Sequence, residues 1–210
     1  MEVQKIILNP FQMNCYIYYD KNSGESIIID PAVSVEAEKK KIIEFVDKNK
    51  IKINYIINTH GHIDHVMGNN WAKETFTVPI FIHGKDIELL KSAANQGALF
   101  GITVSKQPHP DKFVSDGDII EFNHCKIKVL HTPGHSQGSI CLVDEKNKTI
   151  FSGDTIFKES IGRTDLPGGD YDLLIKSIKE KLLVYPDDFT IYPGHMEETT
   201  IGKEKKLILS

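Results

Sequence analysis

Short apolar runs open the chain and predict β-strands. Three runs rich in Ile, Tyr and Val, separated by turn-forming residues, predict antiparallel strands at the start of a sheet. They span residues 3–8, 13–19 and 26–30. A helical apolar spacing then covers residues 34–49, where Ser34 is placed to act as the N-cap. The first quarter of the chain therefore predicts three strands followed by an amphipathic helix.

The next stretch alternates strands with helices. Residues 53–58 read as a buried strand, and the apolar spacing of residues 66–76 predicts a helix after it. Residues 79–83 predict another short strand, and residues 86–92 a short helix. Residues 93–110 show no regular period and contain two glycines and two prolines, which predicts a loop or lid.

A second group of strands follows and ends in a second helix. The predicted strands are residues 119–122, 126–130, 139–143, 149–152 and 190–192. The first two form a hairpin across Asn123-His124. A glycine-rich loop at residues 162–169 leads into an amphipathic helix at residues 171–184. Strands followed by helices thus occur twice without a linker, which predicts an α+β fold, a four-layer αββα sandwich forming one domain over residues 1–210.

Charge and composition exclude several classes of partner. The 210 residues carry 25 basic and 29 acidic side chains, a net charge of −4, and no basic cluster interleaved with aromatic residues. We therefore expect no nucleic-acid partner. The amino terminus lacks the apolar segment of a signal peptide, and no run of eighteen apolar residues occurs, so we expect a soluble, cytoplasmic protein without a membrane partner. Cys15, Cys125 and Cys141 are widely spaced in apolar runs, which is typical of reduced, core-packed thiols.

The densest cluster of possible metal ligands lies between the predicted strand at residues 53–58 and the predicted helix at residues 66–76. Residues 59–65 read Thr-His-Gly-His-Ile-Asp-His, so His60, His62, Asp64 and His65 fall within six positions. Burying three imidazoles and a carboxylate together is expensive unless a cation holds them. A histidine-rich turn in solvent is the simpler alternative. A strand-to-helix turn allows these four side chains to face one point, which favours a metal site.

Three more candidate ligands stand where predicted strands end, and each follows a glycine. They are His135, Asp154 and His195. A glycine before a ligand lets the backbone turn sharply and approach a shared centre. Five histidines and two aspartates suit two metal ions better than one. His60, His62 and His135 form one predicted group, Asp64, His65 and His195 a second, and Asp154 is placed to bridge them.

This set of residues resembles the metallo-β-lactamase superfamily, whose HxHxDH signature matches His60, His62, Asp64 and His65. His135, Asp154 and His195 match the remaining ligand positions in the same order, and the resemblance covers nearly the whole chain. It implies the αββα sandwich with a metal site at the edges of the sheets. True β-lactamases of the superfamily typically carry a cysteine where this chain has Asp154, which disfavours antibiotic hydrolysis.

Within the superfamily the chain resembles the glyoxalase II-type (hydroxyacylglutathione hydrolase-like) enzymes, in particular their short bacterial members. The resemblance rests on residues 153–157 and 161–165, a stretch that also looks like that of the persulfide dioxygenases. Full-length glyoxalase II has a helical C-terminal domain that contributes to the glutathione site, and this chain ends fifteen residues after His195. We therefore expect no such domain, and a substrate pocket built from residues 93–110 and 162–170.

The resemblance implies a binuclear hydrolase, a thioesterase acting on S-acyl glutathione or a similar small-molecule thioester. Two divalent metal ions, zinc first and iron or manganese as alternatives, would lower the pKa of a shared water and give a hydroxide that attacks the carbonyl. Asp64 would orient that hydroxide as the catalytic residue.

Several other polar residues invite roles near this centre. Arg163, or a nearby lysine such as Lys158, could bind a substrate carboxylate. A salt bridge from Arg163 to Asp165 or Asp170 is the alternative. The hydroxyls expected to bond imidazoles or carboxylates, or else to act as simple caps, are those of Thr59, Thr132 and Ser136. The remaining histidines, expected to be structural or exposed, are His83, His109, His124 and His131.

Other activities fit the same residues. A mononuclear iron persulfide dioxygenase would use His60, His135 and Asp154 as its facial triad. Another metallo-hydrolase of the same fold would use all seven ligands. A metal buffer is a third alternative, although buffers need no open coordination position and usually use thiolates. The spacing of the ligands does not separate the two enzyme classes.

Overall fold

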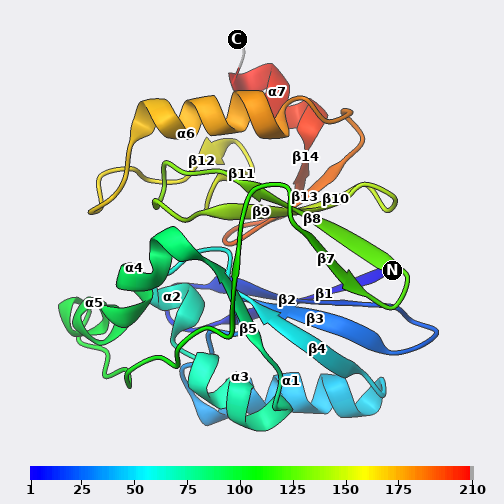
Figure 1. The fold of residues 1–210 in the computed structure, drawn as a ribbon, viewed down its shortest axis with the longest axis vertical. Coiled ribbons are helices and arrows are strands. Elements are labelled where there is room, and N and C mark those ends of the chain that lie inside the picture. Colours follow the sequence, from blue (N-terminus) through cyan, green and yellow to red (C-terminus); the bar gives the residue numbers. More distant parts are fainter. Residues whose placement is uncertain (209–210) are drawn as a thin grey trace.

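The computed structural model describes residues 1–208 and contains two six-stranded sheets that pack face to face (Figure 1). The first sheet has the order β1-β2-β3-β4-β5-β6. Its first three strands are antiparallel, as predicted, and the later ones pair in parallel. The strands are β1 (Glu2–Leu8), β2 (Met13–Tyr19), β3 (Glu25–Ile29), β4 (Lys52–Ile57), β5 (Ile80–His83) and β6 (Lys112–Val114).

The second sheet has the order β14-β13-β10-β9-β8-β7. It contains the predicted hairpin, β7 with β8, and one parallel pair, β10 with β13. The strands are β7 (Ile119–Phe122), β8 (Cys125–His131), β9 (Ile140–Asp144), β10 (Thr149–Gly153), β13 (Thr190–Pro193) and β14 (Thr199–Thr200). A separate two-stranded hairpin consists of β11 (Ile156–Phe157) and β12 (Ser160–Ile161).

Helices cover the outer face of each sheet, which completes the four layers (Figure 1). Below the first sheet lie α1 (Glu36–Lys48) and α3 (Asn69–Phe76), and above the second lie α6 (Tyr171–Ser177) and α7 (Ile201–Ile208). A π-helical turn, Ile178–Leu182, continues α6. The short helices α2 (Ile63–Val66), α4 (Ile87–Lys91) and α5 (Ala93–Leu99) gather at one side, beyond the ends of β4 and β5. The predicted αββα sandwich is confirmed.

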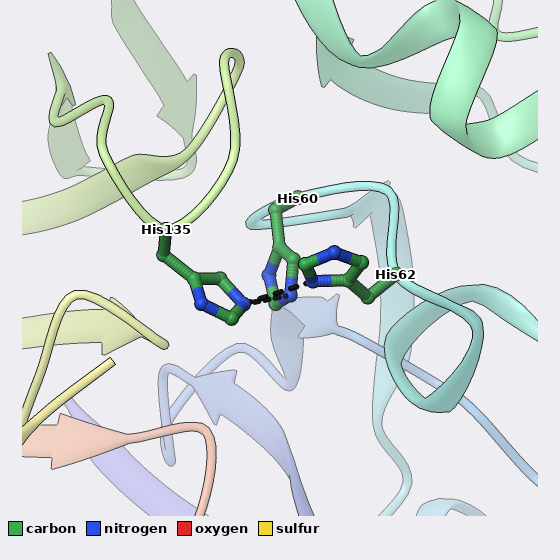
Figure 2. Close-up of side chains that lie close together, drawn as sticks. All are labelled: His60, His62 and His135. Atoms are coloured by element: carbon green, nitrogen blue, oxygen red, sulfur yellow. Dashed lines mark hydrogen bonds between the residues drawn. The ribbon is translucent and has the colours of Figure 1, made fainter. Parts of the chain in front are cut away.

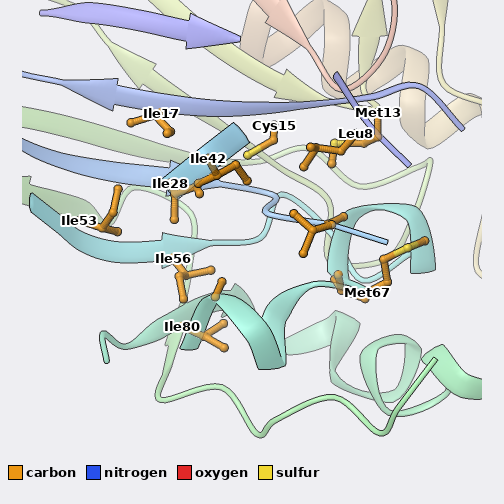
Figure 3. Packing of buried hydrophobic residues seen from close by; sticks show 14 of the residues in the cluster. Leu8, Met13, Cys15, Ile17, Ile28, Ile42, Ile53, Ile56, Met67 and Ile80 are labelled. Atoms are coloured by element: carbon orange, nitrogen blue, oxygen red, sulfur yellow. The ribbon is translucent and has the colours of Figure 1, made fainter. Parts of the chain in front are cut away.

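Three apolar clusters separate these four layers. Strand β3 shows the reason, because Ile28 faces the helices below while Ile27 and Ile29 face the second sheet. Side chains alternate along a strand, so a continuous apolar run such as Ile27-Ile28-Ile29 can be buried on both faces. Figure 3 shows the cluster between the first sheet and its helices, where Ile28 and Ile56 pack with Ile42 of α1. Between the sheets, the Tyr16 and Tyr18 rings pack on Phe151, with centroids 5.3 and 5.2 Å apart.

The predicted helix at residues 66–76 is wrong at its start. The structure has two helices, α2 and α3, interrupted at Met67-Gly68. A Cβ atom on Gly68 would lie 2.0 Å from the carbonyl oxygen of Pro31 and 2.5 Å from the amide nitrogen of Val33. The chain breaks here because another backbone segment occupies the space that a side chain would need.

Two other local predictions are corrected, and some elements were not predicted. Residues 93–110 are not a continuous loop, because Ala93–Leu99 form α5. Ser34 is not the N-cap of α1, since the helix begins after Val35 and the Glu38 carboxylate accepts from the amides of Ser34 and Val35 at 2.6 and 3.3 Å. Strand β6 and helix α7 were not predicted. Their apolar patterns are too short to indicate an element before the neighbouring sheet is in place.

Candidate metal centre

The first group of candidate ligands comes from two loops on opposite sheets. His60 and His62 lie in the turn between β4 and α2, and His135 lies in the loop between β8 and β9. Figure 2 shows the three rings pointing at one another. His135 Nε2 lies 2.9 Å from His62 Nδ1 and 3.2 Å from His60 Nε2. All three side chains are buried, so their ring nitrogens converge in a site largely closed to solvent.

Hydrogen bonds fix the ring nitrogens of His60 and His135 that face away from the centre. His135 Nδ1 lies 2.8 Å from the carbonyl oxygen of Arg163, and His60 Nδ1 lies 3.1 Å from the Thr59 hydroxyl. A bond on one ring nitrogen sets which nitrogen is free and where it points. The Nε2 atoms of both rings are thereby directed towards the centre.

The second group consists of Asp64, His65 and His195. Asp64 Oδ2 lies 3.2 Å from His195 Nε2 and 3.8 Å from His65 Nε2. His65 is fully buried, and its Nδ1 lies 2.9 Å from Oδ2 of Asp30. Asp30 also accepts the amide and hydroxyl of Thr59, at 2.8 and 2.6 Å. A buried carboxylate at the end of β3 therefore orients the deepest imidazole of this group.

Asp154 lies between the two groups. Its carboxylate oxygens are 3.3 Å from His65 Nε2 and 3.6 Å from the Nε2 atoms of both His135 and His195. The donor atoms of His60, His65 and Asp154 also lie within 4.8 Å of one another. One carboxylate thus reaches both groups.

Glycines make this close approach sterically feasible. A Cβ on Gly194 would lie 2.2 Å from Oδ1 of Asp154 and 2.7 Å from Cε1 of His65. Gly134 has a φ of +137° and packs on the backbone of Leu174, where a Cβ would be 2.4 Å away. A larger residue at Gly194 would displace Asp154 or His65, and a larger residue at Gly134 would push its loop away from α6.

The charges of the centre divide it into two halves. Burial, and then the neighbouring imidazoles, lower the pKa of His60 well below its usual value and that of His62 to about 4. Burial would also lower the pKa of His65, but the carboxylates of Asp154, Asp64 and Asp30 raise it well above its usual value. Burial opposes ionisation of Asp154, yet His65 holds its pKa below the usual range. His60 and His62 are therefore neutral and offer lone pairs, whereas the second group pairs imidazoles with carboxylates.

The donor atoms fit divalent metal ions. His65 Nε2 and Asp154 Oδ1 are buried and lie 3.3 Å from each other, yet neither atom makes a hydrogen bond among residues 1–208. Buried polar atoms almost always have hydrogen-bond partners, so these two atoms are suited to binding a cation. The donors are imidazole nitrogens and carboxylate oxygens without a thiolate, a set that zinc, iron and manganese all accept.

The remaining predicted residues are only partly near the centre. Ser136 donates a hydrogen bond to the Asp86 carboxylate at 2.7 Å, whereas the Thr132 hydroxyl lies 3.0 Å from that of Thr155 and bonds no imidazole within residues 1–208. Arg163 forms a bidentate ion pair with Asp165, with both distances 2.7 Å, as the structural alternative predicted. Lys158 pairs with Glu197 at 2.5 Å.

The other histidines and the cysteines lie outside the centre. The His83 and His131 rings stack on each other with centroids 4.0 Å apart, and His124 is exposed. Cys15, Cys125 and Cys141 are buried and free, as predicted. Within residues 1–208, no helix has the length and apolar character that crossing a membrane requires.

Two supporting carboxylates were missed by sequence reasoning. Asp30 follows a strand and precedes a proline, so the strand-end position that drew attention to Asp154 could have indicated it too. Asp86 stands at the predicted start of a helix, where a carboxylate is usually only a cap. Its contacts with both loops of the first group depend on the tertiary fold.

Comparison with known proteins agrees with this geometry. A family model described as the metallo-beta-lactamase superfamily matches residues 8–195. A Haemophilus influenzae protein named hydroxyacylglutathione hydrolase GloC is 36% identical over 208 residues, covering 98% of this chain and 96% of that protein.

Two solved structures are similar over nearly their whole length. The structure of the BLEG-1 B3 metallo-beta-lactamase has a TM-score of 0.89 and 33% identity, covering 98% of this chain and 97% of that one. The protein TTHA1623, solved in a di-iron-bound form, has a TM-score of 0.86 and 32% identity, covering 97% and 98%.

Proposed function

Because the chain belongs to the metallo-β-lactamase superfamily, we propose that it is a binuclear metal-dependent hydrolase that cleaves small thioesters of the S-acyl glutathione type. The observation that carries the proposal is the division of seven donor residues into two groups, with Asp154 reaching both. The 36% identity to a hydroxyacylglutathione hydrolase supports the thioester as substrate.

The proposed ligands divide between two metal ions. His60, His62 and His135 would hold one ion through their ring nitrogens, and Asp64, His65 and His195 would hold the other. Asp154 would neutralise charge on both. Two divalent ions bound there supply Lewis acidity and lower the pKa of water towards neutrality. Zinc is our first choice, and the di-iron form of TTHA1623 keeps iron as the alternative.

Asp64 is our candidate for the residue that orients the attacking water. Its side chain is 18% exposed, whereas that of His65 is fully buried, so its carboxylate faces the open side of the centre. Oδ2 lies 3.2 Å from His195 Nε2, and the Asn9 amide holds the Asp64 backbone oxygen at 2.8 Å. The carboxylate is thus fixed on one side and free to accept a proton from water on the other.

The substrate would lie against two segments that support the ligand loops. In the first, Gln96 of α5 accepts from the Ile63 amide at 3.0 Å. In the second, the backbone oxygen of Arg163 holds His135. Arg163 and Lys158 would bind a substrate carboxylate by exchanging their present partners, Asp165 and Glu197. The free, buried thiols accord with a reducing compartment such as the cytoplasm.

Three assays on one metal-loaded preparation test the proposal. We expect hydrolysis of S-lactoylglutathione, no oxygen consumption with glutathione persulfide, and little turnover of a chromogenic cephalosporin. Asp64→Asn should abolish most of the hydrolysis, whereas Asp111→Asn, at an exposed carboxylate paired with Lys73, should not. Oxygen consumption without hydrolysis would identify a dioxygenase instead. Cephalosporin turnover without the other two activities would indicate a β-lactamase, as BLEG-1 is named.

A further inference from the structure

One buried carboxylate joins the two loops that carry the first group of ligands. Asp86, immediately before α4, is 1% exposed. Its Oδ2 accepts the Gly61 amide at 2.9 Å and the Ser136 hydroxyl at 2.7 Å, and its Oδ1 accepts the Gly138 amide at 2.6 Å. A single oxygen atom therefore connects the loop after β4 with the loop after β8.

The positions of these partners give the contact its importance. Gly61 lies between His60 and His62, and Ser136 directly follows His135. Asp86 therefore touches the backbone between two candidate ligands and the residue beside the third. It does not touch the donor atoms themselves.

Close packing of both loops against Asp86 adds to these hydrogen bonds. A Cβ on Gly138 would lie 2.7 Å from Cγ of Asp86, and a Cβ on Gly61 would lie 3.0 Å from the Asp86 backbone oxygen. Both loops therefore rest on the start of α4 without intervening side chains. Burial raises the pKa of Asp86, and the bonds from Ser136, Gly61 and Gly138 partly offset that effect.

The second group has separate supports. His65 is oriented by Asp30, and the Asp64 backbone by Asn9. The strand before His195 is held by the Asn14 amide, which donates to the Pro193 oxygen at 3.0 Å. None of these contacts passes through Asp86. Loss of Asp86 should therefore disturb one group and spare the other.

We propose that Asp86 is a positioning residue that sets the separation of the two loops and so the metal affinity of the group formed by His60, His62 and His135. The proposal rests on the metal centre of the proposed function, but metal binding tests it independently of hydrolysis. Asp86→Asn is the informative change. An amide keeps one acceptor oxygen and turns an NH₂ group towards hydrogen-bond donors, so at least one of the three bonds is lost.

The experiment isolates each group before testing Asp86. His195→Gln leaves the first group intact, and His62→Gln leaves the second. Zn²⁺ affinity is then measured by calorimetric titration in each background, with and without Asp86→Asn. We expect a loss of about 10- to 100-fold in the His195→Gln background, the usual range for partners of metal ligands, and less than about 3-fold in the His62→Gln background.

Matched controls separate positioning from general damage. Glu88 lies on α4 in an exposed ion pair with Lys91, so Glu88→Gln should not change the Zn²⁺ affinity of either group. Ser136→Ala removes one of the three donors and should weaken the first group alone by a smaller factor, which keeps the test valid if Asp86→Asn fails to fold. Equal losses in both backgrounds, or no loss in the first, would overturn the role of Asp86. If wild-type protein binds Zn²⁺ in both groups but hydrolyses no thioester, only the proposed function fails.

Discussion

At the scale of single residues, Asp154 is the side chain that reaches both groups of candidate ligands. If the centre holds two cations as we propose, replacing Asp154 with Ala would leave them facing each other without a shared carboxylate. We expect Asp154→Ala to weaken metal binding more than about 100-fold, beyond the usual effect of an outer partner, and more than any single His→Ala change in the centre. Elemental analysis after dialysis measures this. A variant that retained both ions with little loss of rate would show that Asp154 is not the bridge.

Arg163 offers a second test at the same scale. Its ion pair with Asp165 is exposed, so Arg163→Ala should leave the thermal unfolding midpoint unchanged. If the guanidinium binds a substrate carboxylate, the variant should raise KM with kcat little changed, because binding lost equally from ground and transition states has that signature. Asp165→Ala, which frees the guanidinium, should not raise KM. An unchanged KM in Arg163→Ala for every carboxylated thioester would remove Arg163 from the substrate site.

At the scale of secondary-structure elements, the break between α2 and α3 depends on Gly68. An added Cβ would overlap the backbone at Pro31 and Val33, which cannot move without shifting β3 and its carboxylate Asp30. We expect Gly68→Ala to lower the free energy of unfolding by about 1–3 kcal/mol in urea titrations. Gly84→Ala is the control, because its Cβ would meet only Phe113 at 3.8 Å, and it should change stability by less than about 0.5 kcal/mol.

The stacked His83 and His131 rings connect β5 of one sheet with β8 of the other and predict a pH effect. Burial, then His131 and Lys85, lower the pKa of His83 to about 4, whereas an unfolded histidine titrates near about 6.5. Between these values the unfolded chain binds more protons, so stability is full above pH 6.5 and falls as the pH drops towards 4.

His83→Gln should remove part of this loss, on the order of 1 kcal/mol between pH 7.5 and 4.5, after allowance for solvent near the rings. Urea unfolding of metal-free protein at the two pH values measures the effect. His124→Gln, at an exposed histidine, should keep the wild-type difference. If wild type and His83→Gln lost the same free energy of unfolding between pH 7.5 and 4.5, the pKa of His83 would not contribute to the pH dependence of stability.

At the scale of the whole molecule, both sheets contribute ligands at one edge, so metal binding should stabilise the entire sandwich. A ligand that binds only the folded state adds about 4 kcal/mol when present at a thousand times its dissociation constant. We expect chelator-treated protein to unfold at lower denaturant concentration than loaded protein. The double variant His62→Gln with Asp64→Asn should show a smaller difference. Equal midpoints for wild type with and without metal would argue against a cation shared between the sheets.

The sequence by itself determined most strands, the four-layer order and the seven residues that converge. The Ile27-Ile28-Ile29 run of β3 is a continuous apolar segment, a local property that indicates burial on both faces wherever the strand lies. Histidines and aspartates after glycines at strand ends are likewise visible in the chain, and burying them together is costly unless a cation holds them.

Only the tertiary structure decided which residues support the candidate metal centre. Asp30 and Asp86 take their roles from residues 35 and 50 positions away, such as His65 and Ser136, and no local pattern encodes such pairs. The break at Gly68 and the edge strand β6 depend in the same way on backbone from another part of the chain. Periodicity reports which face of an element is buried, whereas the identity of the group packed against it is fixed only when the sheets and helices assemble.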